Sequence, residues 1–268
     1  MNSETKNCQN CKNDFIIEPD DFGFYEKIKV PPPTFCPGCR FIRRLIWRNC
    51  RSLYKRSCLL CKKSIISMYS DKDTAPVCCN ECWNGDKRDQ YEYAKDYDFT
   101  KTFFEQLKEL FDVNPRIYLY RIGNIVNSDY TNYTVDNKNC YLAYSVIVCE
   151  DVFYSENIDK SKNTLDSLNV EKLDGCSYNI DCENNFNTHY AIKSQSCVDC
   201  SFVFDCTNCS NCFLSSNLRN QQYVFKNKKY TREEYVNKIE EYKLNTYSGW
   251  IKAIDSFDLM VKNTAIHK

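Results

Sequence analysis

Residues 140–223, cut every twelve positions, read CYLAYSVIVCED, VFYSENIDKSKN, TLDSLNVEKLDG, CSYNIDCENNFN, THYAIKSQSCVD, CSFVFDCTNCSN and CFLSSNLRNQQY. The preceding twelve residues, SDYTNYTVDNKN at 128–139, fit the same frame. A fixed period of this length is typical of stacked coils, in which each repeat packs only on its neighbours. This stretch therefore predicts a solenoid.

Turn-forming residues divide each repeat into two halves. Asn, Asp or Gly ends every repeat: Asn139, Asp151, Asn163, Gly175, Asn187, Asp199 and Asn211. Mostly Asn or Asp also stands at the sixth position, and both types tolerate the left-handed backbone of turns. Between these corners the side chains alternate as in short strands. We therefore expect a narrow β-solenoid of about eight coils with two corners per coil, and inward-facing first, third and seventh positions.

Charge and cysteine content divide the 268-residue chain into four parts. Its 36 basic and 36 acidic residues balance, but residues 1–90 carry a net +5 and residues 128–225 a net −7. Ten of the 19 cysteines lie at or before Cys82, and nine lie from Cys140 onward. We expect a mixed, mainly β fold, with four parts: a basic zinc-binding head (1–90), a helical link (91–127), the β-solenoid (128–228) and a C-terminal capping helix (229–268).

Two stretches outside the repeats have helical patterns. Phe99, Phe103, Phe104, Leu107, Leu110 and Phe111 form one apolar face that ends before Pro115, so we expect a helix that packs between the head and the solenoid. Thr231 and Glu234 form a capping-box pattern ahead of the last apolar stretch. That stretch predicts a helix that covers the end of the solenoid.

Several functional classes are not indicated. The six glycines are too scattered for a phosphate-binding loop, and the two histidines cannot build a multi-histidine metal site. The aspartates of the repeats fall in different columns and form no compact carboxylate pair, so we expect no enzyme activity. The polar N-terminus and the absence of a long apolar run predict an intracellular, cytoplasmic protein with no membrane segment.

Four CxxC pairs lie in the first 82 residues. Such a turn directs two thiolates at one tetrahedral ion, and two turns complete a closed Cys₄ zinc site. Because a closed site leaves no position for substrate, both ions are expected to be structural. The ligands would be Cys8, Cys11, Cys36 and Cys39 in the first site, and Cys58, Cys61, Cys79 and Cys82 in the second. Cys78 is an alternative to Cys79.

The first site carries a resemblance to a known family. CQNCKNDFIIEPDDFGFYEKIKVPPPTFCPGCR, at 8–40, resembles the treble-clef zinc-ribbon family in its CxxC, FYEK, Pro-Pro and CPxCR elements. Farther on, RSLYKRSC, IISMYS, FFEQLKEL and DNKNCYLAY resemble uncharacterised cysteine-rich proteins of candidate-phylum bacteria and large DNA viruses. The resemblance implies this architecture, and a virus-associated protein if the chain is viral, but no activity. Relatives often lack parts of the second site, whereas here it is complete.

The cysteines of the repeats allow three interpretations. They can be small core residues, or disulfides in an oxidising compartment. Alternatively, two CxxC pairs one coil apart can hold a third zinc ion: Cys197, Cys200, Cys209 and Cys212.

A basic stretch separates the two predicted zinc sites. Residues 27–70 contain eleven Lys or Arg and no Asp or Glu. A helix over residues 40–56 would bury an apolar face against the zinc core and present a basic stripe on the other side. The stripe and its flanking aromatic residue comprise Arg40, Arg43, Arg44, Trp47, Arg48, Arg51 and Lys55.

Such a stripe suits phosphate, because Arg donates in pairs to its oxygens and aromatic rings can stack on bases. We therefore expect a non-enzymatic, zinc-stabilised protein whose head binds nucleic acid, with the solenoid as scaffold. The alternative is an assembly protein or particle component whose basic head binds an acidic protein surface. The stripe has two further interpretations, an intramolecular pairing with the acidic solenoid and a solvated face without a partner.

Overall fold

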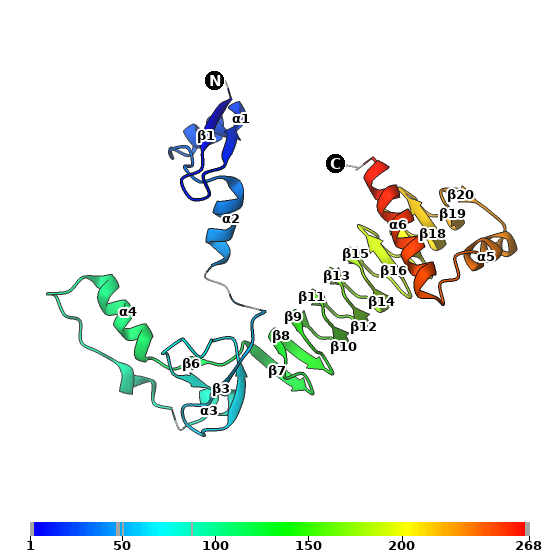
Figure 1. Ribbon diagram of the computed structural model, residues 1–268. Coiled ribbons are helices and arrows are strands. Elements are labelled where there is room, and N and C mark those ends of the chain that lie inside the picture. Colours follow the sequence, from blue (N-terminus) through cyan, green and yellow to red (C-terminus); the bar gives the residue numbers. More distant parts are fainter. Residues whose placement is uncertain (1–2, 47–48, 50, 87, 266–268) are drawn as a thin grey trace. The chain divides into compact units, whose positions relative to one another are not determined.

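The computed structural model describes residues 3–46, 49, 51–86 and 88–265. The chain forms two compact units, residues 1–49 and residues 50–268, so the boundary falls inside the predicted head. Figure 1 shows the elements of both units. Among the described residues, no helix is both long and apolar enough to cross a membrane.

The first unit is a hairpin followed by two helices. Strand β1 (Glu4–Asn7) pairs antiparallel with β2 (Asp14–Ile17). Helix α1 (Pro19–Lys27) begins with a capping box and a proline in its first turn, where no backbone donor is needed. Helix α2 (Pro37–Leu45) also has a proline in its first turn, and Cys36 is its N-cap.

The second unit begins with a similar module. Strands β3 (Tyr54–Ser57) and β4 (Ser64–Ser67) form an antiparallel hairpin, and the short helix α3 (Asn80–Asn84) follows. Between them, β5 (Val77–Cys78) pairs in parallel with β6 (Arg116–Ile117). This pairing connects the module to the beginning of the solenoid.

The link contains a 3₁₀ turn (Gln90–Tyr93) and helix α4 (Phe103–Val113), which ends before Pro115 as predicted. Thr102 and Glu105 form the capping box of α4. None of its residues is buried, and Phe104 is 78% exposed. Packing of this helix between the head and the solenoid stays a prediction.

The predicted β-solenoid is confirmed, with about 9 turns. Strands twelve residues apart pair in parallel and in register, for example Val152 with Thr164 and Ile158 with Val170. Figure 1 shows the stack of short strands. They are β7 (Arg121–Val126), β8 (Thr131–Lys138), β9 (Ala143–Ile147), β10 (Glu150–Phe153), β11 (Glu156–Asp159), β12 (Lys162–Leu165), β13 (Leu168–Glu171), β14 (Asp174–Ser177), β15 (Ile180–Glu183), β16 (His189–Ile192), β17 (Ser201–Phe204) and β18 (Ser210–Ser216).

The side chains of the solenoid follow a period of three, not the predicted alternation. Every third residue is buried, as in the series Cys140, Ala143, Val146, Cys149, Val152, Ser155, Ile158, Ser161 and Thr164. The residue before each of these is left-handed, as in Leu142, Ser145, Val148, Asp151, Tyr154, Asn157, Lys160 and Asn163. A left-handed residue between extended ones bends the chain, so each coil has four bends rather than two. The third position, such as Tyr154, is a bend and does not face inward.

The interior of the solenoid is partly polar because backbone groups at the bends point into it. The N–H of Cys197 donates to Oδ1 of Asn185 one coil earlier, at 2.8 Å. The N–H of Leu173 donates to Oγ of Ser161 in the same way, at 3.1 Å. A small side chain that can accept or donate a hydrogen bond therefore satisfies groups that an aliphatic core would leave unpaired.

Two helices, rather than the single one predicted, cover the C-terminal end. After β19 (Gln222–Phe225) and β20 (Lys228–Lys229) come α5 (Arg232–Glu240) and α6 (Tyr247–Asn263). The predicted capping box of Thr231 and Glu234 begins α5. Phe257 of α6 is buried in a mainly aromatic cluster on the last coils.

Candidate metal centres

The first four predicted ligands come together in the first unit. Cys8 and Cys11 lie on the turn between β1 and β2, while Cys36 and Cys39 lie at the start of α2. Their four Sγ atoms lie within 4.8 Å of one another, and Sγ of Cys11 is 3.8 Å from Sγ of Cys36. This group can hold one metal ion.

Hydrogen-bond donors surround these sulfur atoms. The N–H of Cys36 donates to Sγ of Cys8 at 3.2 Å, and the side-chain amide of Asn10 donates to Sγ of Cys39 at 3.4 Å. The sulfur of Cys36 accepts from the N–H of Cys39 in the first turn of α2. Such donors and the helix N-terminus favour the thiolate, which is the form that binds metal.

The second predicted group also forms, from Cys58, Cys61, Cys79 and Cys82. The sulfur atoms of Cys61 and Cys79 are again 3.8 Å apart. Cys78 lies on β5 and is not part of the group, so Cys79 occupies the ligand position that the sequence left open.

The two modules are duplicates of one another. Cys58 and Cys61 follow Cys8 and Cys11 by 50 positions, and the strands around them have the same bounds with that offset. Each CxxC is followed by a left-handed lysine, and each second pair begins a helix. This sequence of elements, a knuckle in a hairpin followed by a helix that carries the other two ligands, agrees with the resemblance stated above.

The thiols of each group have divergent pKa values. Burial raises the pKa of Cys8, but hydrogen bonds from backbone N–H groups, led by that of Cys36, lower it to about 6. The same balance, with the N–H of Cys79, lowers the pKa of Cys58 to about 6. In contrast, burial and the adjacent sulfur atoms raise the pKa of Cys82 to about 12. Four negative charges so close together repel, and a bound dication removes that repulsion.

The second centre is joined to the solenoid by hydrogen bonds. Tyr118 donates its N–H to the carbonyl of Cys78 and accepts from the N–H of Met68. Its carbonyl also accepts from the hydroxyl of Ser67, and the neighbouring Leu119 is fully buried. The second module therefore forms the N-terminal end of the solenoid.

The predicted helix over residues 40–56 does not form. Helix α2 ends at Leu45, and β3 begins at Tyr54, so Lys55 lies on a strand of the other unit. Arg51 forms an ion pair with Glu156, and its carbonyl accepts a hydrogen bond from the Tyr144 hydroxyl. Trp47 and Arg48 lie outside the described residues. The prediction of a single basic stripe is therefore wrong, because Arg51 and Lys55 belong to the second unit.

Three of the predicted arginines share helix α2. Arg40 donates to the hydroxyl of Tyr25 at 3.2 Å, so its guanidinium is partly engaged. Arg43 and Arg44 are exposed, and each lies over an aromatic ring, that of Phe35 and that of Phe41 respectively.

The opposite face of α2 is apolar and exposed. Ile42 is 65% exposed and Ile46 at the helix end is 74% exposed. Phe41 and Leu45, at 55% and 44%, lie on the same side. The expectation that this face is buried against the metal core is wrong.

Another arginine has a role that the sequence did not suggest. The Arg56 guanidinium donates to the carbonyls of Ser70, Asp73 and Ala75, which orders the loop before β5.

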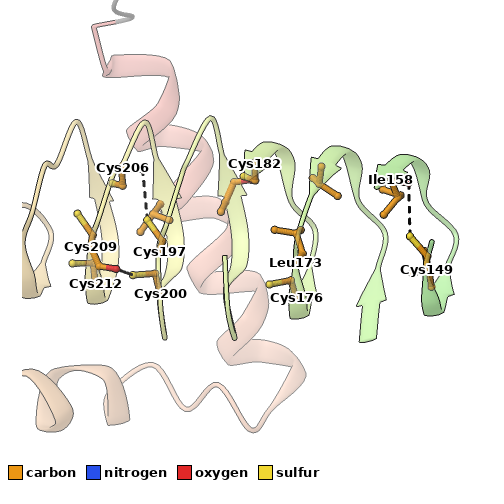
Figure 2. Close-up of a cluster of buried hydrophobic side chains, with 14 of the residues drawn as sticks. Cys149, Ile158, Leu173, Cys176, Cys182, Cys197, Cys200, Cys206, Cys209 and Cys212 are labelled. Carbon is orange, nitrogen blue, oxygen red and sulfur yellow. Dashed lines mark hydrogen bonds between the residues drawn. The ribbon is translucent and has the colours of Figure 1, made fainter. Parts of the chain in front are cut away.

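The cysteines of the solenoid are core thiols in this structure. Cys197, Cys200 and Cys212 are fully buried, and Cys209 is 2% exposed (Figure 2). They are not among the groups of described residues whose ligand atoms lie within 4.8 Å of one another. Their thiols donate to backbone carbonyls, as Cys200 does to that of Cys209.

Burial keeps two other thiols of the solenoid core protonated. It raises the pKa of both Cys149 and Cys182 to about 12. A protonated thiol donates to the carbonyl nine residues farther on, as Cys182 does to Ala191 at 3.3 Å.

No family model matches the chain, and no curated protein shows significant similarity to it. The resemblance to treble-clef zinc ribbons therefore depends on the cysteine spacing and on the geometry of the two modules.

Proposed function

We propose that this chain is a non-enzymatic binding protein with two structural zinc ions and a solenoid scaffold. The observation that carries the proposal is the pair of closed Cys₄ groups. One lies at the N-terminus of the basic helix α2, and the other lies at the N-terminal end of the solenoid. Neither group leaves a ligand position for a substrate.

Zinc fits both groups. A tetrahedral zinc with Zn–S bonds of about 2.3 Å requires sulfur atoms about 3.8 Å apart. The separations of Cys11 from Cys36 and of Cys61 from Cys79 are both 3.8 Å. Four thiolates and no oxygen ligand favour zinc over magnesium or calcium.

The binding surface that we propose for nucleic-acid phosphates lies on the first unit. Arg43 and Arg44 are exposed on α2, and Lys27 and Lys29 are exposed before it. No acidic residue occurs from 27 to 70, so α2 itself carries no negative side chain. Guanidinium groups donate in pairs to phosphate oxygens, which gives a sequence-independent interaction.

A second candidate is docking on an acidic protein surface. The exposed apolar face of α2, with Ile42 and Leu45, favours it, because phosphates offer that face nothing to bury against. A helix with one apolar and one basic face suits a groove with an acidic rim.

Fluorescence anisotropy across a salt series separates these candidates. The zinc-loaded full chain is titrated with duplex DNA, single-stranded DNA and RNA. The test variant is Arg43→Glu/Arg44→Glu. The control Lys228→Glu/Lys229→Glu reverses two charges that are also exposed, on β20. Zinc content and circular dichroism confirm that each variant is folded.

We expect binding that falls linearly on a log–log salt plot, with a slope about 1.8 smaller in the α2 variant, since two phosphate contacts are lost. The control variant retains the full slope. If the folded protein binds none of the three polymers at low salt, the nucleic-acid proposal is wrong and the acidic-protein candidate remains.

A further inference from the structure

Four cysteines occupy stacked positions in the core of the last coils. Strands twelve residues apart pair in register here, so Cys197 lies one coil from Cys209. Cys200 lies one coil from Cys212 in the same way. Adjacent coils are about 4.8 Å apart. Figure 2 shows these four residues, which we call the thiol quartet, inside the solenoid, and none is more than 2% exposed.

The thiols of the quartet contact one another around a closed ring. The thiol of Cys197 hydrogen-bonds with those of Cys200 and Cys209. The thiol of Cys212 hydrogen-bonds with the same two. Cys206 adds a fifth sulfur atom beside Cys209. Each member of the quartet therefore has at least two sulfur neighbours, which makes the last coils a buried site with several soft donors.

The arrangement of the quartet does not suit zinc. A tetrahedral zinc ion requires four sulfur atoms that are all about 3.8 Å apart. Among the described residues, only the two Cys₄ groups of the modules bring their ligand atoms within 4.8 Å of one another. The quartet instead offers neighbouring pairs of thiols. Cu(I) suits such pairs, because it is a soft ion selected by thiolates and two thiolates are enough to bind it.

Backbone N–H groups of the following coil point at these sulfur atoms. The N–H of Cys209 hydrogen-bonds to the sulfur of Cys197, and the N–H of Gln221 to that of Cys209. The N–H of Val224 hydrogen-bonds to the sulfur of Cys212 in the same way. Such donors stabilise thiolates, so the coils already provide the groups that a negatively charged metal–thiolate complex requires.

Loss of the thiol protons would not leave the neighbouring carbonyls unpaired. The thiol of Cys200 donates to the carbonyl of Cys209 at 3.6 Å, but this carbonyl also accepts from the N–H of Val198 at 3.0 Å. The carbonyl of Cys206 likewise accepts from both a thiol and a backbone N–H. Deprotonation of the quartet therefore leaves these backbone hydrogen bonds intact.

We propose that the thiol quartet binds Cu(I) through neighbouring pairs of its thiolates. Each ion that binds two thiols displaces two protons and leaves a complex with one net negative charge, which the N–H groups of the following coil face. Because the quartet is buried, uptake requires local opening of the last coils and is expected to be slow. This inference does not depend on the proposed function.

Substitutions that the solenoid already contains can remove the quartet. Ser161 stands in the column of Cys209, and Thr188 stands in that of Cys212. Both are buried, so the core accommodates these side chains at equivalent positions. The test variant is Cys209→Ser/Cys212→Thr, in which hydroxyl groups replace two of the four soft donors.

The same two columns supply a matched control. Cys149 and Cys176 are 4% and 2% exposed, and they stand one coil from Ser and Thr residues rather than from another cysteine. Cys149→Ser/Cys176→Thr therefore removes two buried thiols from the solenoid and leaves the quartet complete.

Metal counting after prolonged incubation tests the proposal. The zinc-loaded full chain is incubated without oxygen with Cu(I) buffered by bicinchoninate, desalted, and analysed for copper and zinc by mass spectrometry. We expect the unmodified protein and the control to retain at least one copper ion per chain together with their zinc. The test variant should retain its zinc and lose this copper.

Three results would overturn the proposal. The first is an unmodified protein that retains no copper. The second is copper that enters only as zinc leaves, because it would then occupy the modules. The third is a test variant that retains as much copper as the unmodified protein. Circular dichroism shows whether each variant is folded, and Cys197→Ser/Cys200→Thr removes the other half of the quartet if the first variant is not.

Discussion

The hydrogen bonds inside the solenoid predict that an apolar substitution in its core will destabilise it. Asn185 is 2% exposed. Its Oδ1 accepts from the N–H of Cys197 at 2.8 Å, and its Nδ2 donates to the carbonyl of Ser194 at 3.2 Å. Asn185→Leu would leave the N–H of Cys197 buried and unpaired, whereas the carbonyl of Ser194 still accepts from the N–H of Glu183.

The expected magnitude has two unfavourable parts. The unpaired N–H costs about 1–3 kcal/mol, and fitting the larger leucine side chain into the packed core costs about 1–3 kcal/mol more. Burial of the leucine side chain offsets about 1.5–3 kcal/mol of this. We therefore expect a net loss in the free energy of unfolding of about 2 kcal/mol, although the core becomes more hydrophobic.

Urea unfolding followed by circular dichroism is the assay. With a slope of about 2–3 kcal/mol per molar urea, the midpoint should fall by about 1 M. The control Gln195→Leu makes the same kind of change at an exposed position of the same region and should stay within about 0.5 kcal/mol. An Asn185→Leu protein as stable as the unmodified one would refute the reasoning.

Three further predictions follow from other features. Val148, a β-branched residue with φ of 53° and 51% exposure, is strained, so Val148→Asn should raise the free energy of unfolding by about 1 kcal/mol; an unchanged urea midpoint would contradict this. Chelation of metal should unfold residues 3–46, whose described buried apolar side chains are only Cys8, Ile17 and Cys39, while the solenoid keeps its strand signal. If residues 3–46 and the solenoid lose their protection from hydrogen exchange at the same chelator concentration, this prediction is contradicted. Burial lowers the pKa of His189 below its ordinary value of 6.5, so the unfolded chain binds a proton that the folded chain does not. Stability should therefore fall as the pH drops through about 6.5, and the fall should be shallower in His189→Gln; parallel curves would exclude His189 as the cause.

The sequence alone determined the features that local chemistry encodes. A CxxC turn is a short-range structure, so the spacing of Cys8 and Cys11 and of the three later pairs predicted both metal groups. The twelve-residue period likewise predicted the coils, because one repeat can bury its inward-facing side chains only by stacking on its neighbours.

The tertiary structure decided where the chain bends. Two bends per coil were visible in the sequence, since Asn, Asp or Gly marks them, as at Asn157 and Asn163. The other two fall on residues with no preference for a left-handed backbone, such as Tyr154 and Lys160. Backbone hydrogen bonds to the coils before and after impose these bends. These hydrogen bonds form only between stacked coils, so neither a single repeat nor its side-chain pattern predicts the bends.

Tertiary contacts also decided how the basic stretch is divided between the two units. Helical periodicity alone favoured one helix over residues 40–56, but Arg51 interacts with Tyr144 and Glu156, which lie about a hundred residues farther along the chain. Contacts at that separation depend on the folded solenoid, because only stacking of the coils places those side chains beside Arg51. The sequence therefore determined the metal ligands and the repeat, and the packed structure decided which cations remain free to bind a partner.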